Sequence, residues 1–331
     1  MTVWATWRDA THRALYGDEG FYLRERPARH FRTSVHASAV FAGAVLRLLQ
    51  RTDDALGTPA TVDLVDVGSG DGLLAARLLA AAPPALAARL RVTAVDLSPR
   101  PEGLDAEIEW ASIVPGDVTG LVIANEWLDN VPVDVVELTP SGPRMVLVDP
   151  RTGEERLGPA PGPEDLAWLR RWWPLPSAGC RAEIGRPRDE AWASVIGRLS
   201  RGTAVAADYA HQAGARPCLG SLAGYRGGSM VPAVPDGTCD ITAHVALDAC
   251  AAAGERAGAT VTRLTTQREA LTELGVRGDR PPLDLARTDP VAYLRALGRA
   301  SEEAELIAPA GLGGFGWLSQ SRGLPARTGN A

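Results

Sequence analysis

The sequence predicts an α/β fold built on a doubly wound, mainly parallel sheet, with a helical N-terminal segment and an inserted or additional subdomain. Two observations carry this prediction. Residues 60–139 alternate short apolar strands with helices, as in parallel sheets covered on both faces. The apolar run Val62–Val67 passes directly into a glycine-rich turn and then into the apolar helix 72–82. A chain of 331 residues is long enough for one large domain with an insertion.

The glycine turn is the first candidate functional feature. Glycine permits a tight turn and close approach of the backbone to a ligand, and backbone N–H groups at the following helix start would face that ligand. A dinucleotide site prefers G-x-G-x-x-G, but Leu73 occupies the third glycine position here. The G-x-G-x-G spacing is typical of class I methyltransferases, whose cofactor S-adenosyl-L-methionine (SAM) has no pyrophosphate. The candidate cofactor-binding residues in this segment are Asp66, Gly68, Ser69, Gly70 and Gly72. An ordinary strand–turn–helix is the alternative.

The ends of the next strands supply further cofactor-binding candidates. The run from Val92 to Asp96 ends in an acid about 20 residues beyond the glycines, where an acid accepts hydrogen bonds from ribose hydroxyls. The alternative for Asp96 is a helix N-cap or a solvated strand end. The remaining candidates of this kind are Leu97, Ser112 and Asn125.

The segment from Asn125 to Pro132 is the second candidate functional feature. Glu126 and Asp129 are three residues apart, so a helical first turn would place them on one side. Such carboxylates can orient a guanidinium or amine by charge-assisted hydrogen bonds and accept a proton from it. The alternative is that both acids complement a helix dipole.

Composition excludes several other functions. The net charge of −6 argues against a general nucleic-acid binder, and the absence of lysine excludes Schiff-base chemistry. The four cysteines form no C-x-x-C pair, so neither a zinc knuckle nor a disulfide scaffold is expected, and we expect no metal site. No apolar run has transmembrane length and the N-terminus lacks a signal-peptide pattern, so we expect a cytoplasmic protein without membrane partners. A homodimer is compatible with these features.

Several motifs together resemble the MidA-like methyltransferases, a family that includes the mitochondrial protein arginine methyltransferase that helps assemble respiratory complex I. Residues 125–132, N-E-W-L-D-N-V-P, resemble its N-E-f-f-D-A-l-P signature. The similarity covers nearly the whole chain. Other matching segments are F-R-T-S at 31–34, D-Y at 208–209, G-S-L at 220–222 with Y-R at 225–226, D-G-T-C-D-I-T-A-H-V at 236–245, T-Q at 266–267 and F-G-W-L at 315–318.

The resemblance implies a class I fold, SAM as cofactor, and methylation of an arginine side chain of a protein. It makes Glu126, Asp129 and His244 the catalytic candidates, although a lone histidine is more often a packing residue. The substrate-binding candidates are Tyr22, Thr33, Trp127 and Pro132. The sequence departs from the family at Asp66, Val35, His36, Gly228 and the segment Ser98–Pro101, which puts the substrate in doubt more than the cofactor.

We expect four consecutive parts. They are an N-terminal helical cap at 1–58, a SAM-binding core at 59–140, a substrate-side insertion at 141–200, and a completion of the sheet with C-terminal helices and a strand at 201–331. Two other functions remain open: methylation of a small molecule at nitrogen or oxygen, and a non-catalytic assembly factor that retains a SAM fold.

Overall fold

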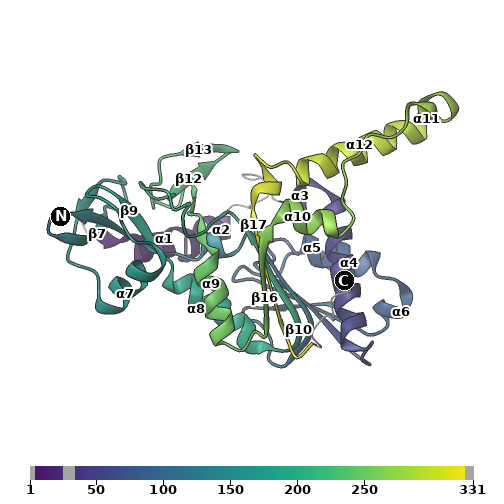
Figure 1. The fold of residues 1–331 in the computed structure, drawn as a ribbon, viewed down its shortest axis with the longest axis horizontal. Coiled ribbons are helices and arrows are strands. Elements are labelled where there is room, and N and C mark those ends of the chain that lie inside the picture. The colour runs from purple at the N-terminus through teal and green to yellow at the C-terminus, as the bar shows by residue number, and fades with distance from the viewer. Residues whose placement is uncertain (1–3, 25–33, 325–331) are drawn as a thin grey trace. The chain divides into compact units, whose positions relative to one another are not determined.

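A computed structural model describes residues 4–24 and 34–324 of the chain. The chain divides into two compact units, each assembled from three separate segments (Figure 1). Unit 1 consists of Met1–Phe31, Glu126–Gly197 and Asp208–Ala259. Unit 2 consists of Arg32–Asn125, Arg198–Ala207 and Thr260–Ala331. The chain therefore passes from unit 2 into unit 1 at the peptide bond between Asn125 and Glu126.

Unit 2 is built on a seven-stranded sheet with the order β16-β17-β10-β5-β2-β3-β4. The strands are β2 (Val62–Val67), β3 (Leu90–Val95), β4 (Ile108–Ala111), β5 (Val118–Asn125), β10 (Leu199–Asp208), β16 (Val261–Thr266) and β17 (Gly316–Arg322). The pairs from β10 through β5, β2 and β3 to β4 are all parallel, and β16 pairs antiparallel with β17. All six residues of β2 are buried because helices cover both faces of a parallel sheet. The predicted fold class is confirmed.

The helices of unit 2 are α3 (Ser34–Ala37), α4 (Ala39–Leu56), α5 (Leu73–Ala81), α6 (Pro84–Ala87), α10 (Gln267–Glu273), α11 (Leu283–Thr288) and α12 (Pro290–Leu306), with the 3-10 turn η3 (Leu312–Gly314). Among them, α4 and α5 bury apolar residues in one core with the strands of this sheet, whereas α11 has no buried residue. The longest is α4, which begins where the Ser38 hydroxyl accepts a hydrogen bond from the Val40 amide and ends at the left-handed Gly57. Its residues Phe41 and Val45 are fully buried in the same apolar core as Leu64 of β2.

Unit 1 contains three smaller sheets. One has the order β1-β7-β6-β9, with β8 pairing with β7, and all its pairs are antiparallel. Its strands are β1 (Ala5–Thr6), β6 (Asp134–Thr139), β7 (Gly142–Val148), β8 (Glu155–Leu157) and β9 (Arg181–Ile184). The others join β11 (Ala210–His211) to β15 (Val245–Ala246), and β12 (Ala223–Arg226) to β13 (Ser229–Val231) and β14 (Asp240–Thr242).

The helices of unit 1 pack on these sheets. They are α1 (Trp7–Tyr16), α2 (Phe21–Arg24), α7 (Pro163–Trp172), α8 (Arg186–Arg198) and α9 (Leu247–Arg256), with the 3-10 turn η2 (Leu128–Asn130). Trp168 of α7 is buried in an apolar cluster with Trp173, and its indole N–H donates to Asp189 of α8 at 2.8 Å. The tryptophans of α7 thus serve packing, as their helical spacing favours.

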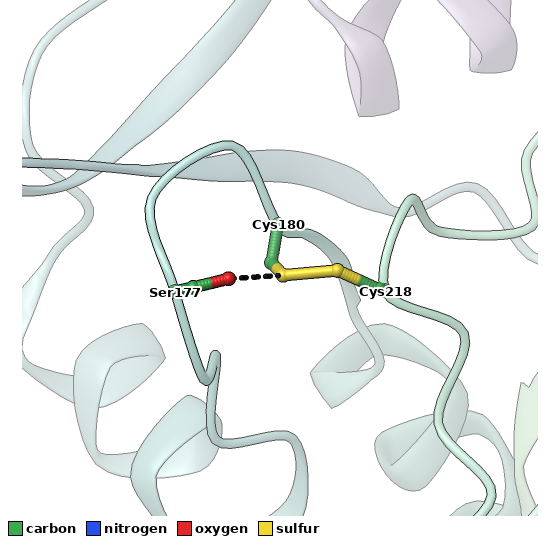
Figure 2. The surroundings of a disulfide bond; sticks show 3 residues. All are labelled: Ser177, Cys180 and Cys218. Carbon is green, nitrogen blue, oxygen red and sulfur yellow. Dashed lines mark hydrogen bonds between the residues drawn. A yellow bond between two sulfur atoms is a disulfide. The ribbon is translucent and has the colours of Figure 1, made fainter.

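A disulfide joins Cys180 to Cys218 across 38 residues of unit 1 (Figure 2). The Ser177 hydroxyl lies 3.3 Å from the Cys180 sulfur. From the sequence we expected no disulfide scaffold; this pairing depends on contact between distant segments and not on a short motif. Cys239 and Cys250 are buried and unbridged. In the described part of the chain, no helix is both long and apolar enough to cross a membrane.

Candidate functional site

The glycine turn of unit 2 joins the end of β2 to the start of α5. Gly68, Gly70 and Gly72 have φ values of 70°, 61° and 76°, a left-handed conformation that favours glycine. A side chain at Gly72 would lie 2.7 Å from Leu104, whereas a side chain at Gly70 would meet no atom within 4 Å. The turn is fixed to the neighbouring strand because the amides of Gly68 and Ser69 both donate to the Val95 carbonyl. The backbone at Gly70 therefore borders open space.

Asp66 lies beneath this turn. Its side chain is 3% exposed, and its carboxylate accepts a hydrogen bond from the Ser69 hydroxyl at 2.6 Å and one from the Ala75 amide in the first turn of α5. Burial raises the pKa of Asp66 to about 7, and the negative charge of Asp96 acts in the same direction. Asp66 thus stabilises the turn through buried hydrogen bonds to the turn and to the start of α5.

Asp96 connects the glycine turn to the end of β3. One carboxylate oxygen accepts the Gly70 amide at 2.8 Å and the other accepts the Ser98 amide at 2.8 Å. Each oxygen keeps a second lone pair, so the half-buried carboxylate can still accept a hydroxyl hydrogen bond. The next residue, Leu97, exposes 65% of its surface, and Ile113 after β4 exposes 64%.

The other cofactor-binding candidates of unit 2 lie at the same edge of the sheet. Asn125 is the buried last residue of β5, and the exposed Ser112 follows β4. Because β2, β3, β4 and β5 are parallel, their carboxyl ends meet at one edge, where α/β sheets bind ligands. The structure therefore brings the predicted residues of this unit together around the glycine turn.

In unit 1, the segment after Asn125 is held by one carboxylate. The amides of Trp127, Leu128 and Asp129 donate to Oδ2 of Asp208 at 3.2, 2.8 and 3.3 Å. Glu126 immediately before them has a φ of 51°, unusual for a residue with a side chain. Three charge-assisted hydrogen bonds offset the cost of that conformation. Asp208 is the last residue of β10 and was not among the predicted site residues.

Asp129 is buried at 5% exposure and is fixed from both sides. Its Oδ2 accepts the Thr242 hydroxyl at 2.7 Å, while its main-chain carbonyl accepts from the Arg188 guanidinium at 2.5 Å. Arg188 also donates to the carbonyls of Val131 at 3.1 Å and His244 at 3.0 Å. The arginine is 2% exposed. It therefore connects the Glu126–Pro132 segment to the segment carrying His244.

The remaining unit 1 candidates surround this segment. The Tyr22 hydroxyl donates to Asp240 at 2.8 Å, and the Asn130 amide donates to the same oxygen at 3.4 Å. Burial raises the pKa of Asp240 to about 7, with the charge of Asp129 acting in the same direction. His244 is exposed; its amide donates to the Ser221 hydroxyl and its ring stacks on Tyr209 with centroids 5.7 Å apart.

Trp127 and Pro132 are half-buried in the segment itself, and Thr33 lies outside the described residues. The described residues contain no group of three or more His, Cys, Asp or Glu side chains able to hold a metal ion. Asp208, Arg188 and Asp240 are the residues that sequence reasoning missed as parts of this site. Asp208 and Asp240 carried a signal, because each lies in a segment similar to the MidA-like family.

Comparison with known proteins decides the family. Residues 44–265, more than half of the chain, match the family described as "Putative S-adenosyl-L-methionine-dependent methyltransferase". The chain belongs to this family. The methyltransferase fold and the SAM cofactor predicted from the sequence are thereby confirmed. The sequence matches no curated protein.

Two solved structures from Burkholderia thailandensis are similar over nearly the whole length of this methyltransferase. One, bound to S-adenosyl-homocysteine, is 28% identical with a TM-score of 0.81, and covers 98% of this chain and 89% of its own. The other, a native structure, is 27% identical with a TM-score of 0.80, and covers 98% and 88%.

The residues of unit 2 fit the SAM cofactor. SAM supplies a methyl group already activated by its sulfonium, so the protein has to bind and orient it. The open backbone at Gly70 admits a ligand, and Asp96 has free acceptor capacity for hydroxyl groups. The exposed side chains of Leu97 and Ile113 offer apolar surface of the kind that covers a flat ring. These residues, with Ser112 and Asn125, are those we expect to hold SAM.

Proposed function

We propose that this methyltransferase acts on a nitrogen of an arginine side chain of a protein. The observation that carries the proposal is the way Asp208 holds the segment containing Glu126 and Asp129 through three consecutive amides. This arrangement fixes two acidic residues one and four positions after the end of β5, whose last residue we expect to contact the cofactor. The half-buried Glu126 suits a cationic or N–H-bearing acceptor, because its carboxylate can orient the acceptor by a hydrogen bond, and the buried Asp129 close behind it can take up the proton that the acceptor loses.

The charge around Asp129 supports the same acceptor chemistry. The carboxylates of Asp129, Asp208 and Glu183 lie near the guanidinium of Arg188: burial lowers the pKa of this arginine, and the three acids act to raise it. Arg188 gives its three hydrogen bonds described above to carbonyl oxygens. An excess of acidic groups over cationic ones favours a positively charged acceptor.

The direct test is incubation of the purified full chain with methyl-labelled SAM and a cell lysate, followed by acid hydrolysis and detection of methylarginine. We expect labelled methylarginine with the wild-type chain, and at least a tenfold loss with Glu126→Gln, which keeps the size of the side chain but removes its charge. Label found only in small molecules would replace the protein acceptor with a metabolite. Absence of SAM binding by calorimetry would favour a non-catalytic assembly role.

A further inference from the structure

Asp129 and Asp208 share an unusual pattern of hydrogen bonding. Oδ2 of Asp208 accepts three amides and Oδ2 of Asp129 accepts the Thr242 hydroxyl. Oδ1 of each carboxylate is buried and has no hydrogen-bond partner among the residues that the structure describes. The two side chains are 5% and 1% exposed, so bulk water does not substitute for a partner. A buried polar atom left unsatisfied costs free energy, and a charged one costs more.

The carboxylate of Asp208 lies close to Asp129, whose own main-chain amide donates to it at 3.3 Å. Burial raises the pKa of Asp208 well above its ordinary value, and the charge of Asp129 is the next cause. Burial likewise raises the pKa of Asp129. Arg188 opposes both shifts but gives its described hydrogen bonds to carbonyl groups. Two neighbouring carboxylates in such a place do not both ionise readily.

We propose that Asp129 and Asp208 share one proton, which their unpartnered Oδ1 atoms hold between them. A carboxylate oxygen can only accept, whereas a protonated carboxyl group also donates. One proton therefore satisfies both orphan oxygens and reduces the buried charge from two to one. It also leaves Oδ2 of Asp208 free to hold the amides of residues 127–129, so the shared proton stabilises the left-handed turn at Glu126.

If the proposed function holds, the Asp129–Asp208 pair can take up the proton that methyl transfer releases. N-methylation replaces an N–H bond by an N–C bond, the sulfonium sulfur keeps the electron pair of the broken S–C bond, and one proton is released. A pair that shares one proton retains one ionised carboxylate. It therefore has capacity for one more proton, the number that the reaction releases.

Several charged or titratable groups face this pair, and the test has to separate them from it. They are Arg188 of α8, Glu126, Tyr22, Tyr209, Asp240 and Cys250 of α9. Infrared spectroscopy of single variants can separate them, because a protonated carboxyl group has a C=O stretching band that an ionised carboxylate lacks. Spectra of the full chain at about neutral pH are compared for the wild type, Asp129→Asn, Asp208→Asn and the double variant.

We expect each single variant to lose the same protonated-carboxyl intensity, equal to one group, and the double variant to lose no more. Asparagine presents an N–H donor to the remaining carboxylate, so the variants keep the turn and the remaining acid ionises. Asp189→Asn is the matched control, since Asp189 is also buried but accepts from Trp168 and Cys250 through its two oxygens. It should leave the Asp129–Asp208 band in place.

Two outcomes overturn the proposal: no loss in either single variant, or a loss in the double variant equal to the sum of the two singles. A second readout covers poor folding. Asp208→Asn should retain the wild-type circular dichroism, because the asparagine oxygen still accepts the three amides and its N–H group donates to Asp129. A single variant that folds like the wild type and keeps the protonated-carboxyl band at full intensity contradicts the shared proton. Neither readout needs a methyl acceptor, so failure to detect methylarginine would refute the proposed function and leave this inference standing.

Discussion

A methyl group added at Gly70 should separate cofactor binding from stability. Gly70 has a φ of 61°, and a side chain there would meet no protein atom within 4 Å. Gly70→Ala therefore costs only the backbone strain of a left-handed alanine, about 1–2 kcal/mol. The new methyl group would occupy the open space that we assign to SAM. We expect SAM affinity to fall about 100-fold, equivalent to about 2.8 kcal/mol.

The chain offers a matched control for this variant. Gly57 has a φ of 78°, also has nothing within 4 Å, and is the exposed residue that ends α4, ahead of the amino end of β2. Gly57→Ala should therefore show the same loss of stability in urea unfolding with unchanged SAM affinity in titration calorimetry. The reasoning is refuted if Gly70→Ala binds SAM as tightly as Gly57→Ala does.

Three further perturbations test the buried charges and the disulfide. Asp66 has a pKa of about 7 in the folded chain, above its unfolded value, so the folded state binds an extra proton between these two values. The free energy of unfolding should therefore fall by up to about 4 kcal/mol as pH rises from about 4 to about 7. Urea unfolding should show this loss in the wild type and a flatter pH profile in Asp66→Asn. Arg188→Ala should cost about 3–5 kcal/mol in the same assay, because it leaves buried carboxylates without their cation, and a cost below about 1 kcal/mol would contradict the assigned contacts. Cys218→Ser should lower the free energy of unfolding by about 4 kcal/mol, because the unfolded chain regains the entropy of a 38-residue loop. In reductant the variant and the wild type should be equally stable. A difference that persists in reductant would have a cause other than the disulfide.

The candidate cofactor-binding residues of unit 2 could be predicted together because they are local in the sequence. The strand Val62–Val67, the glycine turn and the helix after it follow one another in the chain, and each has a distinct residue pattern. Asp96 could be predicted because its distance along the chain is set by one strand–helix–strand unit. The structure places all of them at one edge of the sheet.

The residues that hold the acidic segment could not be predicted in the same way. Arg188 lies in a helix with charged neighbours, where an arginine ordinarily indicates a solvated face, yet it is 2% exposed. Its partners are carbonyls more than 50 residues away along the chain, which leave no trace in local spacing. Asp208 has the same character, since it binds amides about 80 residues away.

The hairpin of β12 and β13 could not be predicted from the sequence for a different reason. Residues 221–240 are rich in glycine and proline, a composition that ordinarily indicates a loop. The structure pairs Arg226 with Ser229 across Gly227 and Gly228, whose φ values are 57° and 78°. Two adjacent glycines with positive φ form the tight turn that two-residue hairpins prefer. The Gly227–Gly228 pair indicated a hairpin turn, but the strands on either side are short and lie in a glycine-rich segment, so their own residue pattern did not indicate strands.

The distribution of strained and buried groups distinguishes function from packing in unit 1. Asp189 is buried and its pKa is raised to about 6, but both of its oxygens have partners and its neighbour Trp168 belongs to an apolar core. Asp129 and Asp208 are buried as deeply, yet each has one oxygen without a hydrogen-bond partner among the residues that the structure describes, and Glu126 nearby has a left-handed backbone. Packing alone would favour apolar residues at such positions, because an incompletely satisfied carboxylate costs stability. The cost is concentrated in the segment that directly follows β5, and this placement, more than the number of acidic residues, argues that the segment handles protons.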